Sequence, residues 1–325
     1  MSPIEKALRR VDGFQQRHRA LSFVFGVIKK FGDDAAGTLV ALITYYGFLS
    51  LFPLLLVLTT VLGLFFAHDT ALQTRIIDSA VGQFPIVGNQ LAGPNGVGSL
   101  RAGSVVGLIV GLIGLVWGSL GVSQAAQRAM AEVWNIPGVI RPGFFPRLGR
   151  SIEFISILAL DLVLTTFLVG SVTLGHGTVW IQVLKAVTSL GASVMLYVLG
   201  FRVLTPKTIK TRWLIPGAVL AGAGWTILQV AGTLLVGHTL RHANQTYGYF
   251  GSVLGLISFL YLAAQVTVYA AEVNVVRARH LYPRSIAPPP LTPADRIVLS
   301  AITAQGERRP EQRVQVDLPS PRHDE

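Results

Sequence analysis

Six long apolar stretches constrain the fold of this chain more than any other feature of its sequence. A helix that crosses the hydrocarbon core of a bilayer needs about 20 mostly apolar residues. Stretches of about that length or longer lie at about 38–66, 103–124, 152–174, 180–203, 214–236 and 249–276. Only 13% of the residues are charged, against roughly 25% in an average soluble domain. The sequence therefore predicts an all-α, polytopic membrane protein, a bundle of six transmembrane helices, and argues against a soluble enzyme.

Lys and Arg are unevenly distributed among the segments that connect these stretches. Seven of the 27 lie in the first 33 residues, four between the second and third stretches, four around the loop between the fourth and fifth, and eight after the sixth. Alternating the stretches across a membrane places 23 of the 27 on one side. Cytoplasmic loops of membrane proteins carry the excess of positive charge. Both termini are therefore expected in the cytoplasm.

The same pattern divides the chain into three parts. Residues 1–33 are expected to form a cytoplasmic N-terminal amphipathic segment, in which the apolar run 20–28 is too short to span and lies on the inner membrane surface. Residues 34–280 form the transmembrane domain, with the largest outer loop at about 67–102. Residues 281–325 are a Pro-rich, mostly disordered cytoplasmic tail.

One short helix is nevertheless predicted in the tail. Thr292 suits its N-cap, Pro293 its first position and Gly306 its end.

The net charge of +11 fits two kinds of partner, nucleic acid or the anionic lipids of the inner leaflet. Nucleic-acid readers concentrate basic residues on one face, whereas here they are spread over four segments with little aromatic interleaving. We therefore expect anionic membrane lipids as partners and no nucleic acid. The chain has no cysteine and no phosphate-binding Gly-x-x-x-x-Gly-Lys-Ser/Thr loop. His238 and His242, four residues apart, have a weak metal-compatible spacing, but Arg241 between them indicates a polar loop. Accordingly, we predict no catalytic residues, metal or cofactor, and no enzyme activity.

Glycines recur three and four residues apart in the second and sixth stretches. Small residues at this spacing line one helix face and let another backbone approach closely. Two interpretations stay open: static helix packing, which is the usual use of such faces, and a sliding surface in a conformational cycle. The predicted packing glycines are Gly103, Gly107, Gly111, Gly114, Gly118, Gly251 and Gly255.

Asp161 is the most informative single residue, because it lies about ten residues into the third stretch, roughly 15 Å deep at 1.5 Å per residue. Intramembrane acids are costly and mark proton or cation sites, or else structural ion pairs. For Asp161 both interpretations stay open, with Lys185 as a possible partner. In the first stretch, Pro53 predicts a kink, either static or part of a broken helix that lines a cavity.

A set of polar or helix-breaking positions within the stretches defines a candidate substrate pathway. Glu272 belongs to it, although ion pairing with a nearby arginine at the membrane interface is the expected role of this acid and of Glu153. The pathway candidates are Tyr45, Ser50, Pro53, Asp161, Gln229, Gln265 and Glu272. They predict a transporter, or a translocator of a lipid or amphiphile, that uses a polar intramembrane cavity for an unknown small-molecule or lipid substrate. The alternative is a membrane scaffold or interaction protein with a basic cytoplasmic face.

Four sequence blocks between about residues 20 and 280 resemble the YihY/BrkB family of bacterial inner-membrane proteins, formerly labelled ribonuclease BN. The blocks are Asp33-Asp34 with Thr44 to Pro53, Trp117 to Asn135 followed by Arg141, Pro216-Gly217-Ala218 with Trp225, and Tyr247 to Ser252 with Ala271-Glu272-Val273-Asn274. The resemblance implies six helices, a multi-pass location in the inner (plasma) membrane, and transport of a lipid or another amphiphile. Ribonuclease activity is not expected, because no nuclease site is visible in the sequence.

Overall fold

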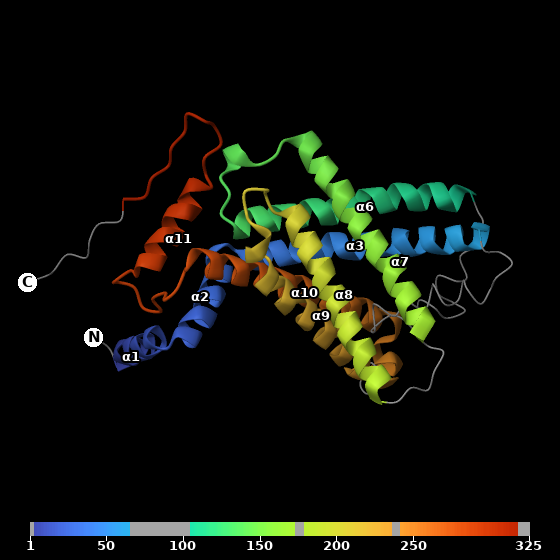
Figure 1. Ribbon diagram of the computed structural model, residues 1–325, viewed down its shortest axis with the longest axis horizontal. Coiled ribbons are helices and arrows are strands. Elements are labelled where there is room, and N and C mark those ends of the chain that lie inside the picture. Colours follow the sequence, from blue (N-terminus) through green and yellow to red (C-terminus); the bar gives the residue numbers. More distant parts are fainter. Residues whose placement is uncertain (1–2, 66–104, 173–178, 236–240, 318–325) are drawn as a thin grey trace, which may run out of the picture.

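The structure, a computed structural model, describes residues 3–65, 105–172, 179–235 and 241–317. It is built of helices, without a strand in these ranges, so the all-α prediction is confirmed for them (Figure 1). The predicted outer loop at 67–102, Gly103 and residues 318–325 lie outside the described residues. The α-helices are α1 (Pro3–Arg17), α2 (Arg19–Asp33), α3 (Ala36–Phe65), α6 (Val105–Val133), α7 (Phe144–Val172), α8 (Val179–Leu204), α9 (Ile215–Leu235), α10 (Arg241–Arg279) and α11 (Pro293–Ala304).

Five of these helices contain a segment long and apolar enough to cross a membrane. The segments are Ala36–Val57, Leu108–Val133, Ala186–Leu204, Ile215–Gly232 and Val253–Arg279, with mean hydropathies from 1.3 to 2.1. Only 17–28% of each most apolar window is buried inside the protein, so most apolar side chains point outward, as they do toward lipid. Helix α7, expected as the third span, is not among the five, and the count of six spans stays a prediction.

The first and last described helices, α1 and α11, lie at the same end of the molecule (Figure 1). Helices α1, α2 and α11 gather there, and α2 runs across the direction of α3 rather than along it. The two expected parts outside the bundle, the N-terminal segment and the tail, are therefore neighbours in space.

The tail is more ordered than the sequence predicts. Residues 281–317 follow a defined path, and Leu281, Arg284 and Val298 are each about 1% exposed. The expectation of a mostly disordered tail is thus wrong for these residues, because a buried arginine and the apolar face of α11 fix them to the bundle. The short helix is confirmed: Thr292 caps its N-terminus in a capping box with Asp295, and Gly306 follows its C-cap.

Helices α3 and α6 make the most extensive helix contact among the described residues, and glycines of α6 line it. A Cβ added at Gly118 would lie 2.8 Å from the Cα of Ser50, and one at Gly114 would lie 3.0 Å from the Cγ of Pro53. Gly111 meets Val57 in the same way. The absence of side chains lets the two backbones approach, which strengthens dispersion contacts where hydrophobic burial gives no driving force.

The other predicted packing glycines are less informative. Gly107 lies in α6, while Gly251 and Gly255 are half-buried in α10.

We predict that Gly118→Ala destabilises the bundle, because the new methyl group meets the α3 backbone and no side-chain rotation relieves the clash. The expected loss is about 1–3 kcal/mol, as for other overpacked sites. The matched control is Gly191→Ala in α8, where an added Cβ meets nothing within 4 Å. This control should gain about 0.5–1 kcal/mol from helix propensity. Thermal unfolding of the purified protein in detergent measures both, and equal shifts would contradict the close contact.

Candidate functional site

Helix α2 places charged residues of opposite sign four residues apart on two adjacent faces. Lys29 and Asp33 lie on the face toward the tail, and Lys30 and Asp34 lie on the face toward the bundle. Since residues i and i+4 are neighbours on a helix surface, each face presents a cation beside an anion. Two separate polar networks are built on these faces.

The first network, here called the Lys30 cluster, consists of Lys30, Asp34, Asn135 and Glu272. The Lys30 ammonium donates to Asp34 Oδ2 and, at 3.0 Å, to the carbonyl of Val133. Its Nζ lies 3.7 Å from Glu272 Oε2. The side chains of Lys30 and Glu272 are both 0% exposed, and that of Asp34 is 1% exposed. The cluster therefore joins α2, the end of α6 and α10 through groups removed from water.

Asn135 contributes to the cluster because of how α6 ends. Asn135 has a φ of 47°, a left-handed conformation that Asn tolerates better than most residues. Its N–H donates to Glu132 O and that of Ile136 donates to Ala131 O, which together form a Schellman motif. The turn directs Asn135 Nδ2 to Asp34 Oδ1 at 3.1 Å.

Glu272 is the unusual member of the cluster. Neither of its buried carboxylate oxygens has a hydrogen-bond partner among the described residues. Two carboxylates share the single ammonium of Lys30, so the fully ionised triad carries a net charge of −1. Arg279, the last residue of α10, donates to the carbonyl of Trp134 at 2.8 Å. A buried group without partners is costly, and one bound proton would neutralise the triad.

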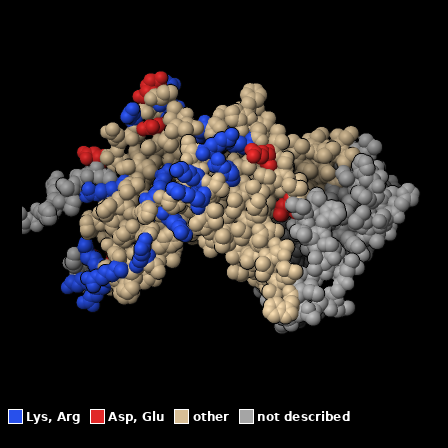
Figure 2. Space-filling model, viewed as in Figure 1, with Lys and Arg blue, Asp and Glu red and all other residues tan. Residues whose placement is uncertain are grey.

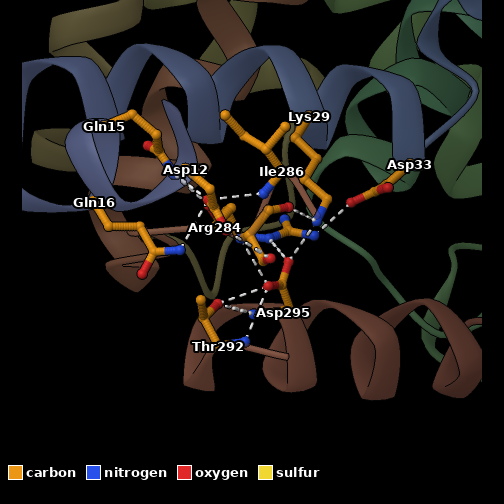
Figure 3. A network of polar contacts seen from close by, with 10 residues as sticks. Asp12, Gln15, Gln16, Lys29, Asp33, Arg284, Ile286, Thr292 and Asp295 are labelled. Atoms are coloured by element: carbon orange, nitrogen blue, oxygen red, sulfur yellow. Dashed lines mark hydrogen bonds and ion pairs between the residues drawn. The ribbon is translucent and has the colours of Figure 1, made fainter. Parts of the chain in front are cut away.

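The second network, here called the tail network, fixes the tail to α1 and α2 (Figure 3). Arg284 donates from Nε to Asp295 Oδ1 at 2.5 Å and from Nη2 to Asp33 Oδ2 at 2.6 Å. Lys29 Nζ donates to the same Asp295 oxygen at 2.8 Å and to Ser285 O at 2.6 Å. Planar guanidinium groups suit such paired carboxylate contacts.

Helix α1 joins the tail network through Asp12 and Gln15. Asp12 accepts from the Ile286 backbone at 3.0 Å and from Ser285 Oγ at 3.2 Å, and Gln15 Nε2 donates to Arg284 O at 2.6 Å. The N-terminal helices, the tail and the first residues before α3 thus form one polar assembly.

The carboxylates of the two networks differ in electrostatics. Burial raises the pKa of Asp34 above its ordinary value, although Lys30 and Asn135 oppose the shift. Burial acts in the same direction on Asp295, but donors from Lys29, Arg284, Ser285 and Thr292 outweigh it and hold the pKa well below the ordinary value. The tail network thus stabilises the ionised carboxylate of Asp295, whereas burial makes ionisation of Asp34 less favourable than in water.

The structure brings only one of the predicted pathway residues, Glu272, into the Lys30 cluster. Tyr45 is 57% exposed on α3, and Ser50 and Pro53 pack against the glycines of α6. Asp161 is half-buried in α7, without an ion-pair partner among the side chains that the structure describes, and the side chain of Lys185 is not among these.

Gln229 and Gln265 are half-buried in α9 and α10. The expected arginine partner of Glu272 is replaced by Lys30, and Glu153 is exposed.

Sequence reasoning missed Lys30, Asp34 and Asn135 as site residues. Lys30 was assigned to the end of an amphipathic segment, since nothing in one sequence shows that residue 272 lies beside it. The available signal was the repeated i, i+4 charge pair at 29–34, next to a block that resembles the family pattern.

Asn274, two residues after Glu272, has a structural role. Its Oδ1 accepts from Gly217 N at 2.6 Å, and an added Cβ at Gly217 would lie 2.1 Å from Ala270 O. Gly217 is in the first turn of α9, where N–H groups have no partner within the helix. The last span therefore supplies a cap to the preceding helix.

Lys and Arg gather over the end of the molecule that carries α1, α2 and α11, while the apolar half is nearly free of them among the residues drawn in colour (Figure 2). Exposed Lys207, Lys210 and Arg212 lie in the connection between α8 and α9. This separation of charge from apolar surface, together with five candidate spans, defines a multi-pass integral membrane protein.

Comparison with known proteins specifies the family. The family model "Virulence factor BrkB" matches residues 27–292, and the chain belongs to this BrkB family, as its sequence blocks predict. The inner membrane protein YhjD of Escherichia coli (strain K12) is 25% identical over 280 residues, which cover 79% of this chain and 81% of that protein.

An uncharacterised protein of Dickeya dadantii (strain 3937) is 25% identical over 284 residues, covering 80% and 85% of the two chains. No solved structure matches the chain significantly. The relatives and the apolar helices together support a location in the inner membrane.

Acid should loosen the attachment of α11 to the N-terminal helices. Asp295 has a lower pKa folded than unfolded, so its contribution to stability is complete above its unfolded pKa of about 4 and is lost progressively as the pH falls from there toward the lower folded pKa. Spin labels at Gly13→Cys and Ile297→Cys, both at open positions, should give one narrow distance distribution at neutral pH that broadens progressively as the pH falls below about 4.

Asp295→Asn should broaden that distribution at neutral pH. The control Glu311→Gln, at an exposed position of the same tail, should leave it unchanged. A distribution that stays narrow in acid and in Asp295→Asn would contradict the role of the network.

Proposed function

We propose that this chain is an inner-membrane transporter, specifically a translocator of a lipid or another amphiphile, in which the Lys30 cluster binds and releases a proton. The observation that carries the proposal is the buried carboxylate of Glu272, which shares one ammonium with Asp34 and has no hydrogen-bond partner among the described residues. Ionisable groups kept inside a membrane bundle at such cost mark ion pathways and proton relays.

Proton binding at the cluster changes a contact between three elements. With Glu272 ionised, its charge attracts the Lys30 ammonium across 3.7 Å. With Glu272 protonated, that attraction is lost, and Lys30 stays bound to Asp34 and to the carbonyl of Val133. Proton binding at Glu272 therefore weakens the attachment of α2 to α10. The proton shifts the equilibrium between two arrangements of these helices only by the difference in its binding free energy for the two.

Other features support transport over chemistry. The proposal includes no enzyme activity and no cofactor. The close α3–α6 contact through glycines offers a surface on which helices slide, as alternating access requires.

The scaffold alternative rests on the exposed basic residues Lys207, Lys210 and Arg212, which suit an anionic partner. Deleting residues 281–325 does not discriminate between the two functions, because Arg284 and Asp295 hold the N-terminal helices. Glu272→Gln does discriminate, since a scaffold keeps its function in this variant and a proton-coupled transporter loses it.

The proposal includes six spans, with both termini in the cytoplasm. Because the chain has no natural cysteine, a single Gly13→Cys variant reports the side of the N-terminus. A membrane-impermeant maleimide should label it in inside-out vesicles and leave it unlabelled in intact spheroplasts. The reverse pattern would contradict the orientation.

Lipid translocation is tested with fluorescent NBD-phospholipid in proteoliposomes, where external dithionite bleaches only the outer leaflet. With a pH gradient imposed, the wild type should move lipid between leaflets faster than empty liposomes do. Glu272→Gln and Asp34→Asn should slow this movement about 5- to 150-fold, the usual range of coupling between two sites. Glu153→Gln, an exposed acid on α7, is the matched control and should retain the wild-type rate.

Two outcomes would contradict the proposal. Bleaching that matches empty liposomes for the wild type would reject lipid as the substrate, and a wild-type rate in Glu272→Gln would reject the cluster as the coupling site. Infrared difference spectra recorded on acidification distinguish these two outcomes. A band of a protonated carboxyl group that appears in the wild type and is absent in Glu272→Gln shows proton binding at Glu272 independently of transport.

A further inference from the structure

Helices α1 and α2 expose apolar side chains and bury polar ones, the reverse of an ordinary helix on a water-facing surface. On α1, Ile4, Leu8 and Val11 are 44–73% exposed, whereas Asp12 and Gln15 are 9% and 5% exposed. Large apolar side chains on a water-facing helix normally pack toward the core, and contiguous exposed patches of them mark interaction sites.

Helix α2 also exposes an apolar face. Leu21, Val24 and Ile28 are 46–54% exposed and follow one another at intervals of three and four residues, so they share one face. The opposite side of α2 holds Ser22, Lys29 and Lys30 in the polar networks. The protein thus uses the polar sides of these helices for its own contacts and leaves their apolar sides open.

Basic residues flank the apolar surface. On α1, Lys6, Arg10 and Arg17 are exposed and lie on one side of the apolar stripe, about 100° or more around the helix from Val11. Arg19, at the start of α2, is exposed as well. An amphipathic helix with an apolar face and a basic polar face is typical of segments that lie in the interface of an anionic bilayer.

The membrane lies within reach of these helices. Helix α2 ends at Asp33, and the first candidate span begins at Ala36. The C-terminal end of α2 is therefore at the membrane boundary. Because α2 runs across the direction of α3 (Figure 1), its length of 15 residues extends sideways over the boundary and not away from it.

We infer that helices α1 and α2 form a binding surface for anionic phospholipids, with Leu8, Val11, Val24 and Ile28 inserted among the acyl chains and Lys6, Arg10 and Arg17 at the headgroup phosphates. Basic residues next to an anionic leaflet are attracted to its headgroup phosphates. Since α2 also carries Lys30 and Asp34, lipid composition acts on the same helix that holds the Lys30 cluster.

Single cysteines test the insertion in the full-length protein, which has none of its own. Spin labels at Leu8→Cys, Val11→Cys and Val24→Cys are compared with one at Gly13→Cys, where an added Cβ meets nothing within 4 Å. Gly13 lies about 160° around the helix from Val11. The protein is placed in nanodiscs of phosphatidylcholine with phosphatidylglycerol. We measure how often each label collides with oxygen, which enters the acyl region, and with a nickel complex, which stays in water.

The expected result is an oxygen-to-nickel collision ratio several-fold higher at the three apolar positions than at Gly13→Cys. The combined change Lys6→Glu, Arg10→Glu and Arg17→Glu should lower the ratio at Leu8→Cys, as should nanodiscs of phosphatidylcholine alone. Equal ratios at Leu8→Cys and Gly13→Cys would overturn the inference. A low collision rate with the nickel complex at Leu8→Cys that is independent of lipid charge and accompanied by spin–spin broadening would also overturn it. That result would identify a second copy of the chain as the occupant.

Discussion

The contact of the Lys30 ammonium with two buried carboxylates is the interaction on which the arrangement of this protein depends. It joins the helix that precedes the first span to the end of the last one, and the carbonyl of Val133 adds the end of α6. A buried charge without its partner is far more costly than a missing surface pair. The three elements are therefore held together because each buried charge requires its oppositely charged partner. Binding or release of one proton changes the net charge of the Lys30 cluster.

Helix α2 divides two tasks between its faces. Lys29 and Asp33 hold the tail, while Lys30 and Asp34 hold the bundle. In the tail network Asp12 and Asp295 each accept from several donors, and the pKa of each is lowered. In the Lys30 cluster donors are scarce, and burial raises the pKa of Asp34. The first network is suited to a stable attachment and the second to a change of protonation.

The sequence predicts the helices well and the site poorly, for physical reasons. Apolar length and small-residue spacing are local properties, so the helices and the cap at Thr292 follow from neighbouring residues. The Lys30 cluster depends on residues 30, 34, 135 and 272, which only the packed bundle brings together. The proline and charge content of the tail predicts disorder. Composition does not show that Arg284 forms buried ion pairs, and these fix the segment. Asp161, the most prominent intramembrane acid in the sequence, has no ion-pair partner among the described side chains.

The bond from Gly217 N to Asn274 Oδ1 has a consequence for the synthesis of the chain. Its two residues are 57 positions apart, so the ribosome completes α9 well before Asn274 exists. During that interval the first turn of α9 has its amide open to water or to the translocation machinery. The start of α9 therefore reaches its final hydrogen-bonded environment only when α10 arrives.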